Sequence, residues 1–483
     1  MLWLLWLLLP TFALYVWKKR NEYSRRRYCS VLDGTDDGDR LPKCIVTVGI
    51  FHPYANGGGG GERVLYCFLE SLIEHFLVNR SHQHLRIVLY TGDDRIDKHE
   101  LIQKAASRFN LPQLNKVEQH LHLVILRNRE LLEPSRYPRF TLLCQSIAHI
   151  RVARHAFRQG ERAGYFPQYW VDTTGCPFSY PVAKYFYGCK VIAYVHYPMI
   201  SSDMTERVRN RCAEFNNDAT IANSSLRSNC KYAYYRMFSW IYYTAGCCTD
   251  RVMVNSTWTY EHIFHMWRIK ADIVYPPCGD MAYVTDNNIE RKPWILSISQ
   301  FRPEKNQLLQ LQAMRWLLRN YKDEIHQEFP TIKLVLLGSC RNEEDVNRVE
   351  MLKGKAKEYG IAENVDFIVN ASFQKLTYYL QNCTVGIHTM CKEHFGIGIV
   401  EMMAAGLIVI AHNSGGPAFD IIQEGAGYLA DTVEEYGQHV YNILRTPTLK
   451  LAEMQQLSAA SVKRRFSDAQ FRQKLLAVWE SII

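Results

Sequence analysis

Short apolar runs alternate with helical patterns along almost the whole of the 483-residue chain. Runs of about four to eight apolar residues are typical of buried strands, and helices that alternate with them indicate a parallel sheet. A break from Asp280 to Lys292 divides this alternation into two series. The chain is therefore predicted to be an α/β protein with two Rossmann-like domains that face a cleft. The predicted strands are Cys44 to Phe51, Arg86 to Thr91, Leu121 to Leu126, Trp170 to Asp172, Lys190 to Val195, Trp294 to Ile298, Lys333 to Leu337, Val365 to Val369, Val385 to His388 and Leu407 to Ala411.

Glu393 and Glu401 flank the predicted start of a helix that contains Gly396 and Gly398. At about 1.5 Å and 100° per residue, their separation along a helix is roughly 12 Å, so they can contact opposite ends of one extended ligand. Two carboxylates that share one catalytic step lie closer, at about 5 to 9.5 Å. Backbone N–H groups at a helix start bind phosphate, so the motif predicts a nucleotide-sugar site. Taken alone, the pair would fit an ordinary amphipathic helix with two exposed glutamates.

A run of glycines from Gly57 to Gly61 lies between the first predicted strand and a helical pattern that begins at Val64. Without a Cβ, such a turn lets the backbone approach a diphosphate closely. The run is neither G-x-G-x-x-G nor a Walker loop, so a dinucleotide-binding oxidoreductase lacks its fingerprint. A flexible linker is the alternative interpretation, and the strongly apolar elements on both sides disfavour it.

Two more strand ends carry polar groups. Arg302 and Lys305 follow the predicted strand that ends at Ile298, and such cations can neutralise the charge that develops on a departing diphosphate. A solvated basic turn is the alternative. His196 follows the strand that ends at Val195, where α/β proteins form ligand sites, although a lone histidine is more often structural.

Together these motifs resemble those of the retaining GT-B glycosyltransferases with an E-x7-E signature. The chain is most similar to the GDP-mannose-dependent dolichol-pathway α-1,2-mannosyltransferases of asparagine-linked glycosylation, from about Cys44 to the C-terminus. The matching segments, in order, also include Val252 to Trp258, Val274 to Cys278, Leu336 to Arg341 and Ala411 to Pro417.

The resemblance implies a role for each motif. Glu393 contacts the transferred sugar, Glu401 holds the ribose, and His196 lies near the sugar. Members of the class place their arginine two residues earlier, where this chain has Gln300, so Lys305 is the better candidate than Arg302 for the diphosphate. The predicted catalytic residues are Glu393, His196 and Lys305, and the predicted donor-binding residues are Gly58, Gly59, Gly60, Arg302, Lys305, Phe395, Gly396, Ile397, Gly398 and Glu401.

The implied reaction transfers mannose from GDP-mannose, with retention, to dolichol-diphosphate-linked Man3GlcNAc2, twice, to give Man5GlcNAc2. No metal or other cofactor is expected, because no D-x-D motif follows a predicted strand. Asp37-Gly-Asp39 lies in a polar linker, and Asp93-Asp94 is interpreted as a helix-capping turn. Two other functions stay open: another GT-B glycosyltransferase acting on a lipid-linked acceptor, or a non-catalytic scaffold that binds the nucleotide-sugar.

The N-terminus carries a membrane signal. Met1 to Trp17 is almost entirely apolar and precedes basic residues at Lys18 to Arg20 and Arg25 to Arg27. As a helix the apolar stretch reaches about 25 Å, at the lower edge of what spans a bilayer, and its basic flank favours the cytosolic side. A single-pass protein of the endoplasmic reticulum membrane with a cytosolic catalytic domain is predicted. A cleaved signal peptide is the alternative, but its basic residues would precede the apolar region.

Composition fits a reducing compartment and an anionic partner. The 14 cysteines form no C-x-x-C pair, so neither a zinc site nor a disulfide framework is indicated. The net charge of +9 favours anionic lipid and diphosphates, and the chain lacks the basic helix or aromatic platform of a nucleic-acid-binding protein. The implied partners are GDP-mannose, the dolichol-diphosphate-linked oligosaccharide, the endoplasmic reticulum membrane and other dolichol-pathway mannosyltransferases.

The predicted organisation has four parts. They are an anchor (1–17), a basic and polar linker (18–42), an acceptor domain (43–280) and a GDP-mannose-binding domain (281–467), with a C-terminal helix at about 468–483 that packs back on the acceptor domain. Within the acceptor domain, Tyr232 to Tyr243 is aromatic on all sides. This segment is either a helix that docks on a membrane interface or a buried helix.

Overall fold

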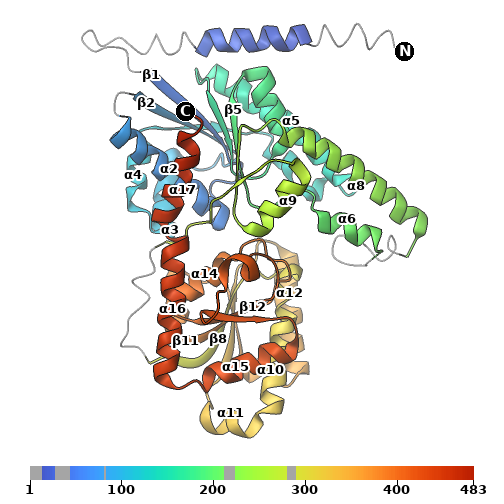
Figure 1. Ribbon diagram of the computed structural model, residues 1–483, viewed down its shortest axis with the longest axis vertical. Coiled ribbons are helices and arrows are strands. Elements are labelled where there is room, and N and C mark those ends of the chain that lie inside the picture. The colour runs from blue at the N-terminus through green and yellow to red at the C-terminus, as the bar shows by residue number, and fades with distance from the viewer. Residues whose placement is uncertain (1–12, 28–43, 81–82, 212–222, 280–289) are drawn as a thin grey trace. The chain divides into compact units, whose positions relative to one another are not determined.

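The computed structural model describes residues 13–27, 44–80, 83–211, 223–279 and 290–483 (Figure 1). These residues form two compact units. Unit 1 comprises the described residues up to Asn255 together with Thr259–Val274 and Arg472–Ile483, and unit 2 comprises Ser256–Trp258 and Tyr275–Phe471. Each unit is an α/β structure with its own parallel sheet, as the alternation of apolar runs predicts.

Most of the predicted anchor and linker, residues 1–12 and 28–43, lies outside the described residues. Residues 13–27 form one helix, which belongs to unit 1. Among the helices of the described ranges, none is both long enough and apolar enough to cross a bilayer.

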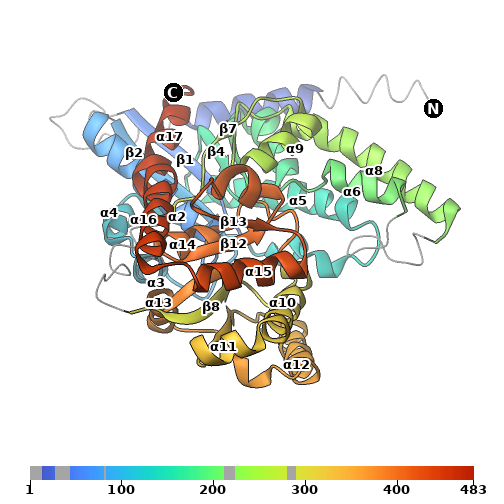
Figure 2. The same ribbon diagram turned by 60° about the horizontal axis from the view of Figure 1, so that its bottom comes forward.

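The sheet of unit 1 has seven parallel strands in the order β3-β2-β1-β4-β5-β6-β7. Its strands are β1 (Cys44–Phe51), β2 (Gln83–Thr91), β3 (Leu121–Ile125), β4 (Tyr169–Asp172), β5 (Lys190–Val195), β6 (Arg251–Val254) and β7 (Asp272–Ile273). Helices cover both faces, with α2 and α17 on one side and α5 and α8 on the other (Figures 1 and 2). The helices are α2 (Gly60–Asn79), α3 (Lys98–Phe109), α4 (Asn115–Glu118), α5 (Thr141–Arg162), α6 (Ser202–Arg209), α8 (Ser225–Gly246), α9 (Thr257–Trp267) and α17 (Asp468–Glu480).

The sheet of unit 2 has six parallel strands in the order β10-β9-β8-β11-β12-β13. Its strands are β8 (Lys292–Ile298), β9 (Lys333–Gly338), β10 (Val365–Val369), β11 (Cys383–His388), β12 (Ile408–His412) and β13 (Gly427–Ala430). Its helices are α10 (Gln307–Asn320), α11 (Lys322–Glu328), α12 (Glu343–Glu358), α13 (Phe373–Asn382), α14 (Ile397–Ala404), α15 (Val433–Leu444) and α16 (Thr448–Phe466). Every strand predicted from the sequence overlaps an observed strand in one unit or the other.

The strand order decides where each unit can bind a ligand. In both sheets the first strand is central, and the chain first builds outward on one side and then on the other. At the point where this direction reverses, the loops at the carboxyl ends of the two adjacent strands diverge and leave a crevice. Those strands are β1 and β4 in unit 1, and β8 and β11 in unit 2.

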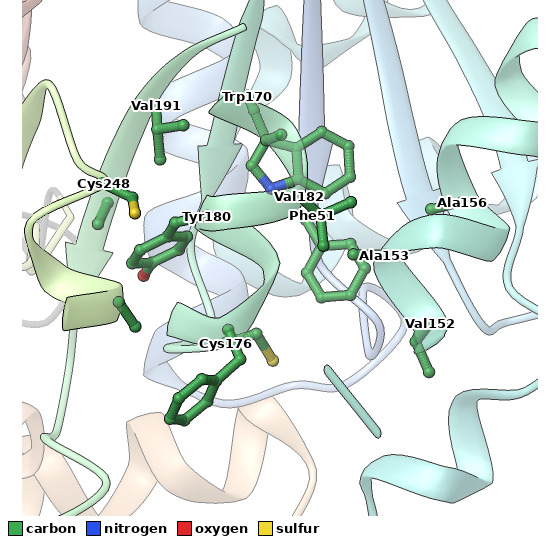
Figure 3. Close-up of a cluster of buried hydrophobic side chains, with 14 of the residues drawn as sticks. Phe51, Val152, Ala153, Ala156, Trp170, Cys176, Tyr180, Val182, Val191 and Cys248 are labelled. Carbon is green, nitrogen blue, oxygen red and sulfur yellow. The ribbon is translucent and has the colours of Figure 1, made fainter. Parts of the chain in front are cut away.

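Aromatic side chains dominate the core of unit 1. The ring of Phe157 stacks between those of Trp170, at a centroid distance of 4.4 Å, and Tyr187, at 3.9 Å. Phe51 packs against the same Trp170, and Figure 3 shows these two side chains among smaller neighbours from α5 and β5. Aromatic rings each bury a large apolar area, so the sheet is fixed to its helices by few but substantial contacts.

The aromatic segment of α8 is partly buried and partly exposed. Phe238 and Tyr242 are buried in the core of unit 1, whereas Trp240 is 68% exposed and Met237 is 49% exposed. The segment is therefore neither a fully buried helix nor a helix that only docks on a membrane. One face packs in the core of unit 1, and Met237 and Trp240 on another face are open to solvent.

The C-terminal helix α17 packs on unit 1 through Trp479, which is 2% exposed. Its ring lies 5.1 Å from Tyr169 and 6.3 Å from Phe68, centroid to centroid. Arg472, near the start of this segment, forms ion pairs with Glu70 and Glu74 of α2. The last residues of the chain are therefore part of the core of unit 1.

We expect Trp479→Ala to lower the free energy of unfolding of unit 1 by about 3 to 5 kcal/mol, because it removes a large buried ring. Urea unfolding followed by circular dichroism would measure this change. The matched control is Leu449→Ala, at a site that is 83% exposed, where a change within about 0.5 kcal/mol is expected. An equal effect of both substitutions would contradict the packing role of Trp479.

Candidate active site

Two loops of unit 2 follow the strands at its switch point. The first, residues 299–306, follows β8 and includes the short 3-10 helix Pro303–Lys305. The second, residues 389–396, follows β11 and leads into α14. The parallel sheet places both loops at the same edge, so their polar side chains can meet.

Glu393 is the centre of the site in unit 2. Its side chain is 9% exposed, and its carboxylate pairs with the ammonium group of Lys305. The Nε2 atom of His388, the last residue of β11, lies 3.1 Å from the same carboxylate. Burial alone would raise the pKa of Glu393, but the charge of Lys305 and the contact with His388 hold that pKa well below its ordinary value of 4.5. Glu393 is therefore a buried anion at neutral pH.

Thr389 holds the two loops in register. Its hydroxyl lies 3.0 Å from the carbonyl oxygens of Lys305 and Asn306. The side-chain amide of Gln310 on α10 donates to the same hydroxyl at 2.9 Å. Lys305 therefore reaches Glu393 because its backbone is bonded to the end of β11.

The Asn413-Ser-Gly-Gly-Pro417 motif is hydrogen-bonded to the backbone of the loop that carries Glu393. The Gly416 N–H donates to the Glu393 carbonyl at 2.8 Å, and the Ser414 hydroxyl accepts the Lys392 N–H at 2.7 Å. Gly415 has φ of +64°, and a Cβ there would lie 2.4 Å from the Glu393 carbonyl oxygen. Only glycine fits this position, so the two sequence motifs form one structural element.

The start of α14 explains the other glycines of the E-x7-E motif. Gly396 precedes the helix with φ of +100°, and a Cβ on Gly398 would lie 2.9 Å from the carbonyl oxygen of Ile298 in β8. The N–H of Ile399 already donates to Gly396, so the N–H groups of Ile397 and Gly398 are the ones without an intrahelical acceptor. They can serve an anionic ligand. In the same motif, Phe395 is buried, and Glu401 is half-buried on α14.

Arg302 lies apart from this cluster. Its guanidinium is 3.8 Å from the carboxylate of Glu304, and both side chains are about one-third exposed at 34% and 32%. The adjacent Phe301 is buried, which turns the flanking residues outward. Of the two predicted phosphate ligands, only Lys305 makes the contact with Glu393.

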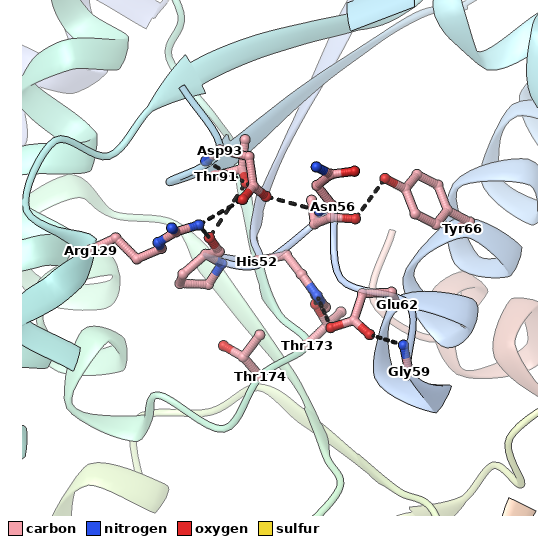
Figure 4. A network of polar contacts seen from close by, with 12 residues as sticks. His52, Asn56, Gly59, Glu62, Tyr66, Thr91, Asp93, Arg129, Thr173 and Thr174 are labelled. Carbon is pink, nitrogen blue, oxygen red and sulfur yellow. Dashed lines mark hydrogen bonds and ion pairs between the residues drawn. The ribbon is translucent and has the colours of Figure 1, made fainter. Parts of the chain in front are cut away.

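The glycine run of unit 1 is a structured turn that begins α2 (Figure 4). The Gly59 N–H donates to the carboxylate of Glu62 at 2.6 Å. His52 lies 3.6 Å from the same carboxylate, and its Nδ1 atom lies 2.7 Å from the Thr173 hydroxyl. Burial raises the pKa of Glu62, but the contact with His52 and the N–H groups of the turn outweigh it and lower that pKa. One amide of the predicted diphosphate cradle is thus bound internally.

Arg108 of α3 lies against the same turn. A Cβ on Gly58 would lie 1.8 Å from the guanidinium carbon of Arg108, so this guanidinium covers the peptide at Gly58. Arg108 is exposed. The turn therefore carries a cation on its surface as well as backbone amides.

The interpretation of Asp93 as part of a helix cap is wrong. The residue that caps α3 is Asp97, whose side chain accepts the Glu100 N–H. Asp93 instead binds Arg129 at 2.6 Å and the Asn56 N–H at 2.8 Å (Figure 4). Because its carboxylate accepts several hydrogen bonds at once, Asp93 fixes the loop that precedes the glycines.

His196 lies beside the glycine turn. Its Nε2 atom would be 3.7 Å from a Cβ on Gly61, and its carbonyl accepts the side-chain amide of Asn255 at 3.0 Å. Asn255 begins the glycosylation motif Asn255-Ser-Thr and is 5% exposed, which leaves no room for a glycan there. The structure thus brings together His196 and the glycine run in unit 1, and Glu393 and Lys305 in unit 2.

Several site residues were absent from the sequence-based prediction. They are His388 and Thr389 beside Glu393, and His52, Glu62, Arg108 and Thr173 beside the glycine run. The signal for His388 was present, because it ends a predicted strand just as His196 follows one. Arg108 carries no local signal, since only the packing of α3 on the turn places it there.

Two family models match the chain. The ALG11 mannosyltransferase N-terminus matches residues 45–267, and the glycosyl transferases group 1 model matches residues 283–459. A mouse protein named GDP-Man:Man(3)GlcNAc(2)-PP-Dol alpha-1,2-mannosyltransferase is 41% identical over 90% of this chain and 87% of its own. Proteins of the same name from human and Caenorhabditis elegans are 40% and 37% identical. The chain belongs to the ALG11 mannosyltransferase family.

Solved structures show the fold of this family member. A glycosyltransferase from Rickettsia africae is similar with a TM-score of 0.59 at 14% identity, over 90% of this chain and 98% of that one. Anabaena HepE in complex with UDP-glucose gives a TM-score of 0.59 at 13% identity, over 90% and 99% of the two chains. The fold is GT-B, with two Rossmann-like domains.

We expect Glu393 to make the stability of unit 2 depend on pH only in acid. Its pKa is lower in the folded protein than in the unfolded chain, so its stabilising contribution is full above about pH 4.5 and is lost as the pH falls toward the folded value. The difference in unfolding free energy between the native chain and Glu393→Gln should therefore be constant above about pH 4.5 and shrink steadily as the pH falls below it. Urea titrations at each pH measure it, and a difference that stays constant in acid would contradict the assignment.

Proposed function

We propose that this chain transfers mannose from GDP-mannose, in α-1,2 linkage and with retention, to dolichol-diphosphate-linked Man3GlcNAc2. The names of its relatives specify this donor, this acceptor and the α-1,2 linkage for those proteins, which match 90% of this chain. Retention is what the resemblance to retaining GT-B enzymes implies. The observation that carries the proposal is the pair of the buried Glu393 and the half-buried Lys305, beside the N–H groups at the start of α14. A carboxylate for sugar hydroxyls and a cation for a diphosphate are the groups that a nucleotide-sugar needs at its scissile bond.

The roles proposed for the residues in unit 2 are those that the family resemblance implies. Glu393 accepts hydroxyl hydrogen bonds from the transferred mannose, because it is ionised, rigid and held by two partners. Lys305 neutralises the charge that builds on GDP as the glycosidic bond breaks. Glu401 binds the ribose, and the N–H groups of Ile397 and Gly398 bind the diphosphate. The acceptor hydroxyl attacks from the face that GDP leaves, so the configuration is retained.

On the side of unit 1, His196 and the glycine turn are proposed to act together. The exposed guanidinium of Arg108 adds a positive charge at Gly58, which suits a diphosphate. Glu62 and His52 shape the turn and do not contact the ligand in this proposal. We propose that the reaction needs no metal. In unit 2 the positive charge for the diphosphate comes from Lys305 and the start of α14.

The proposed location is the endoplasmic reticulum membrane, with the N-terminus as a single-pass anchor and both units in the cytosol. This is supported by the apolar stretch of Met1 to Trp17 and by the acceptor that the relatives' name specifies. Two successive additions, to Man5GlcNAc2, and an association with other dolichol-pathway mannosyltransferases complete the proposal.

The test is transfer of labelled mannose from GDP-mannose to a lipid-linked Man3GlcNAc2 acceptor by the purified full chain. We expect transfer in the presence of a chelator, and a loss of about a hundredfold or more in Glu393→Gln, because the amide neither pairs with Lys305 nor accepts hydroxyls as an anion. Asp366→Asn, which removes an exposed ion pair with Lys333, is the matched control.

Other outcomes identify the alternatives. Binding of GDP-mannose without transfer would indicate a scaffold, and transfer only to a different lipid-linked acceptor would indicate another glycosyltransferase of the same fold. Near-normal turnover of Glu393→Gln would remove Glu393 from the reaction.

We expect Lys305→Ala to reduce turnover more than Arg302→Ala. A contact that strengthens as GDP leaves is worth about 2 to 4 kcal/mol, whereas Arg302 is held by Glu304 on the surface. Rates at saturating GDP-mannose measure the difference. The reverse order would show that Arg302 is the phosphate ligand and that the pair of Lys305 and Glu393 is structural.

A further inference from the structure

The helix of residues 13–27 is built into the core of unit 1. Tyr23, in its second half, is 1% exposed. Its ring makes edge contacts with Phe157, Phe166 and Tyr187 at centroid distances of 6.2, 5.3 and 4.9 Å. These three rings belong to α5, to the approach to β4 and to the segment before β5, so Tyr23 joins several elements of the unit.

Two basic residues on the same side of the helix reinforce this attachment. Lys19 forms an ion pair with Glu161 of α5 at 3.2 Å. Arg27 donates to the carbonyl oxygen of Tyr187 at 2.9 Å, and its guanidinium lies 5.1 Å from the ring of Tyr23. Lys19, Tyr23 and Arg27 are four residues apart, which places them on one face of a helix.

The opposite face of this helix is apolar and basic. Leu14, Lys18 and Arg25 project within about 40° of one another and roughly opposite Tyr23, with Trp17 beside them. We refer to these four residues as the outer face. Leu14 is 62% exposed, Trp17 is 61% exposed, and both basic residues are exposed. Water is a poor environment for the outer face, whereas a lipid surface accommodates leucine and tryptophan at headgroup level and attracts the basic groups.

We propose that the outer face lies flat on an anionic membrane surface, so that Tyr23 and its partners hold unit 1 in one orientation to the lipid plane. This inference rests on the proposed use of a lipid-linked acceptor. It goes further, because the helix is then a rigid platform that starts at the lipid surface. Residues 1–12 alone would reach only about 18 Å as a helix, too short for a bilayer span, so this platform replaces the single-pass anchor proposed above. Charge complementarity favours lipid over a protein partner: Arg20 is also exposed on this helix, and Met1 to Phe12, which precede it, are mostly apolar in sequence. The exposed Arg26 is neutralised by its ion pair with Glu22, so the attraction rests on Lys18, Arg20 and Arg25.

A depth measurement on the full chain tests the orientation without any catalysis. A genetically encoded fluorescent amino acid replaces Leu14, Lys18 or Arg25, one at a time. The protein is bound to phosphatidylcholine–phosphatidylserine vesicles that carry nitroxide-labelled headgroups. We expect equal quenching at all three positions, because a helix that lies flat keeps one face at one depth. The control is the same probe in place of Lys104, exposed on α3, where little quenching is expected.

A helix that runs across or away from the membrane gives a different result. Leu14 and Arg25 would then differ in depth by up to roughly 16 Å, so quenching would change steadily from one to the other. Such a gradient, or equal quenching at Lys104, would overturn the proposal. Either result can be obtained whether or not the protein transfers mannose.

Tyr23 supplies the functional test. Among the described residues its hydroxyl has no hydrogen-bond partner, so Tyr23→Phe keeps the packing, whereas Tyr23→Ala removes it. We expect Tyr23→Ala to lower transfer to a vesicle-embedded acceptor by roughly tenfold relative to transfer to a short-chain, water-soluble acceptor, with Tyr23→Phe unchanged. Lys19→Ala, which removes the ion pair with Glu161 and the contact with the ring of Tyr187, is a milder second variant if Tyr23→Ala does not fold. An unchanged ratio in the folded variant would show that docking of the helix does not matter for transfer.

Discussion

The carboxylate of Glu393 is the constraint on which the site in unit 2 depends. A carboxylate that loses its hydration is stable only when nearby charges and hydrogen bonds replace the water. Lys305, in the loop after β8, and His388, the last residue of β11, do so. The chain must therefore hold the loops after these two strands in contact. The Thr389 hydroxyl does this, and Gly415 and Gly416, after β12, fix the loop that carries Glu393.

Sheet topology makes this meeting possible. β8 and β11 are adjacent and parallel, and from them the chain builds the sheet outward in opposite directions. The loops that follow these two strands therefore lie at the same edge of the sheet and then diverge. The same arrangement recurs at β1 and β4, where His52 and Thr173 follow the two strands and meet. Both clusters thus occupy equivalent positions in their own sheets, although they share no sequence pattern.

The sequence was sufficient to predict most of the strands, because runs such as Lys190–Val195 are short, apolar and bounded by polar residues. It missed β6, β7 and β13, which have only two to four residues each. The sequence also picked out the local motifs of Glu393 and Lys305, which the structure brings into contact. Partners that depend on packing were missed, as Arg108 shows: its position on Gly58 follows from how α3 lies on the turn. For Asp93 the prediction of a helix cap was wrong. An aspartate that caps a helix and an aspartate that fixes a loop are the same in sequence, and they differ only in which hydrogen-bond donors lie near the carboxylate in the fold.

Glycine is required for different physical reasons in the two units, so a glycine motif alone does not imply a phosphate-binding turn. In unit 2, Gly398 and Gly415 are required because backbone packs on backbone, so their function is to bring Glu393 and α14 close to the sheet. In unit 1 the glycine turn is covered by side chains, and the Gly59 amide is already bound to Glu62. A diphosphate at this turn would therefore be bound by fewer amides than the sequence suggests. The guanidinium of Arg108 would then supply much of the attraction, since an arginine fork matches phosphate oxygens.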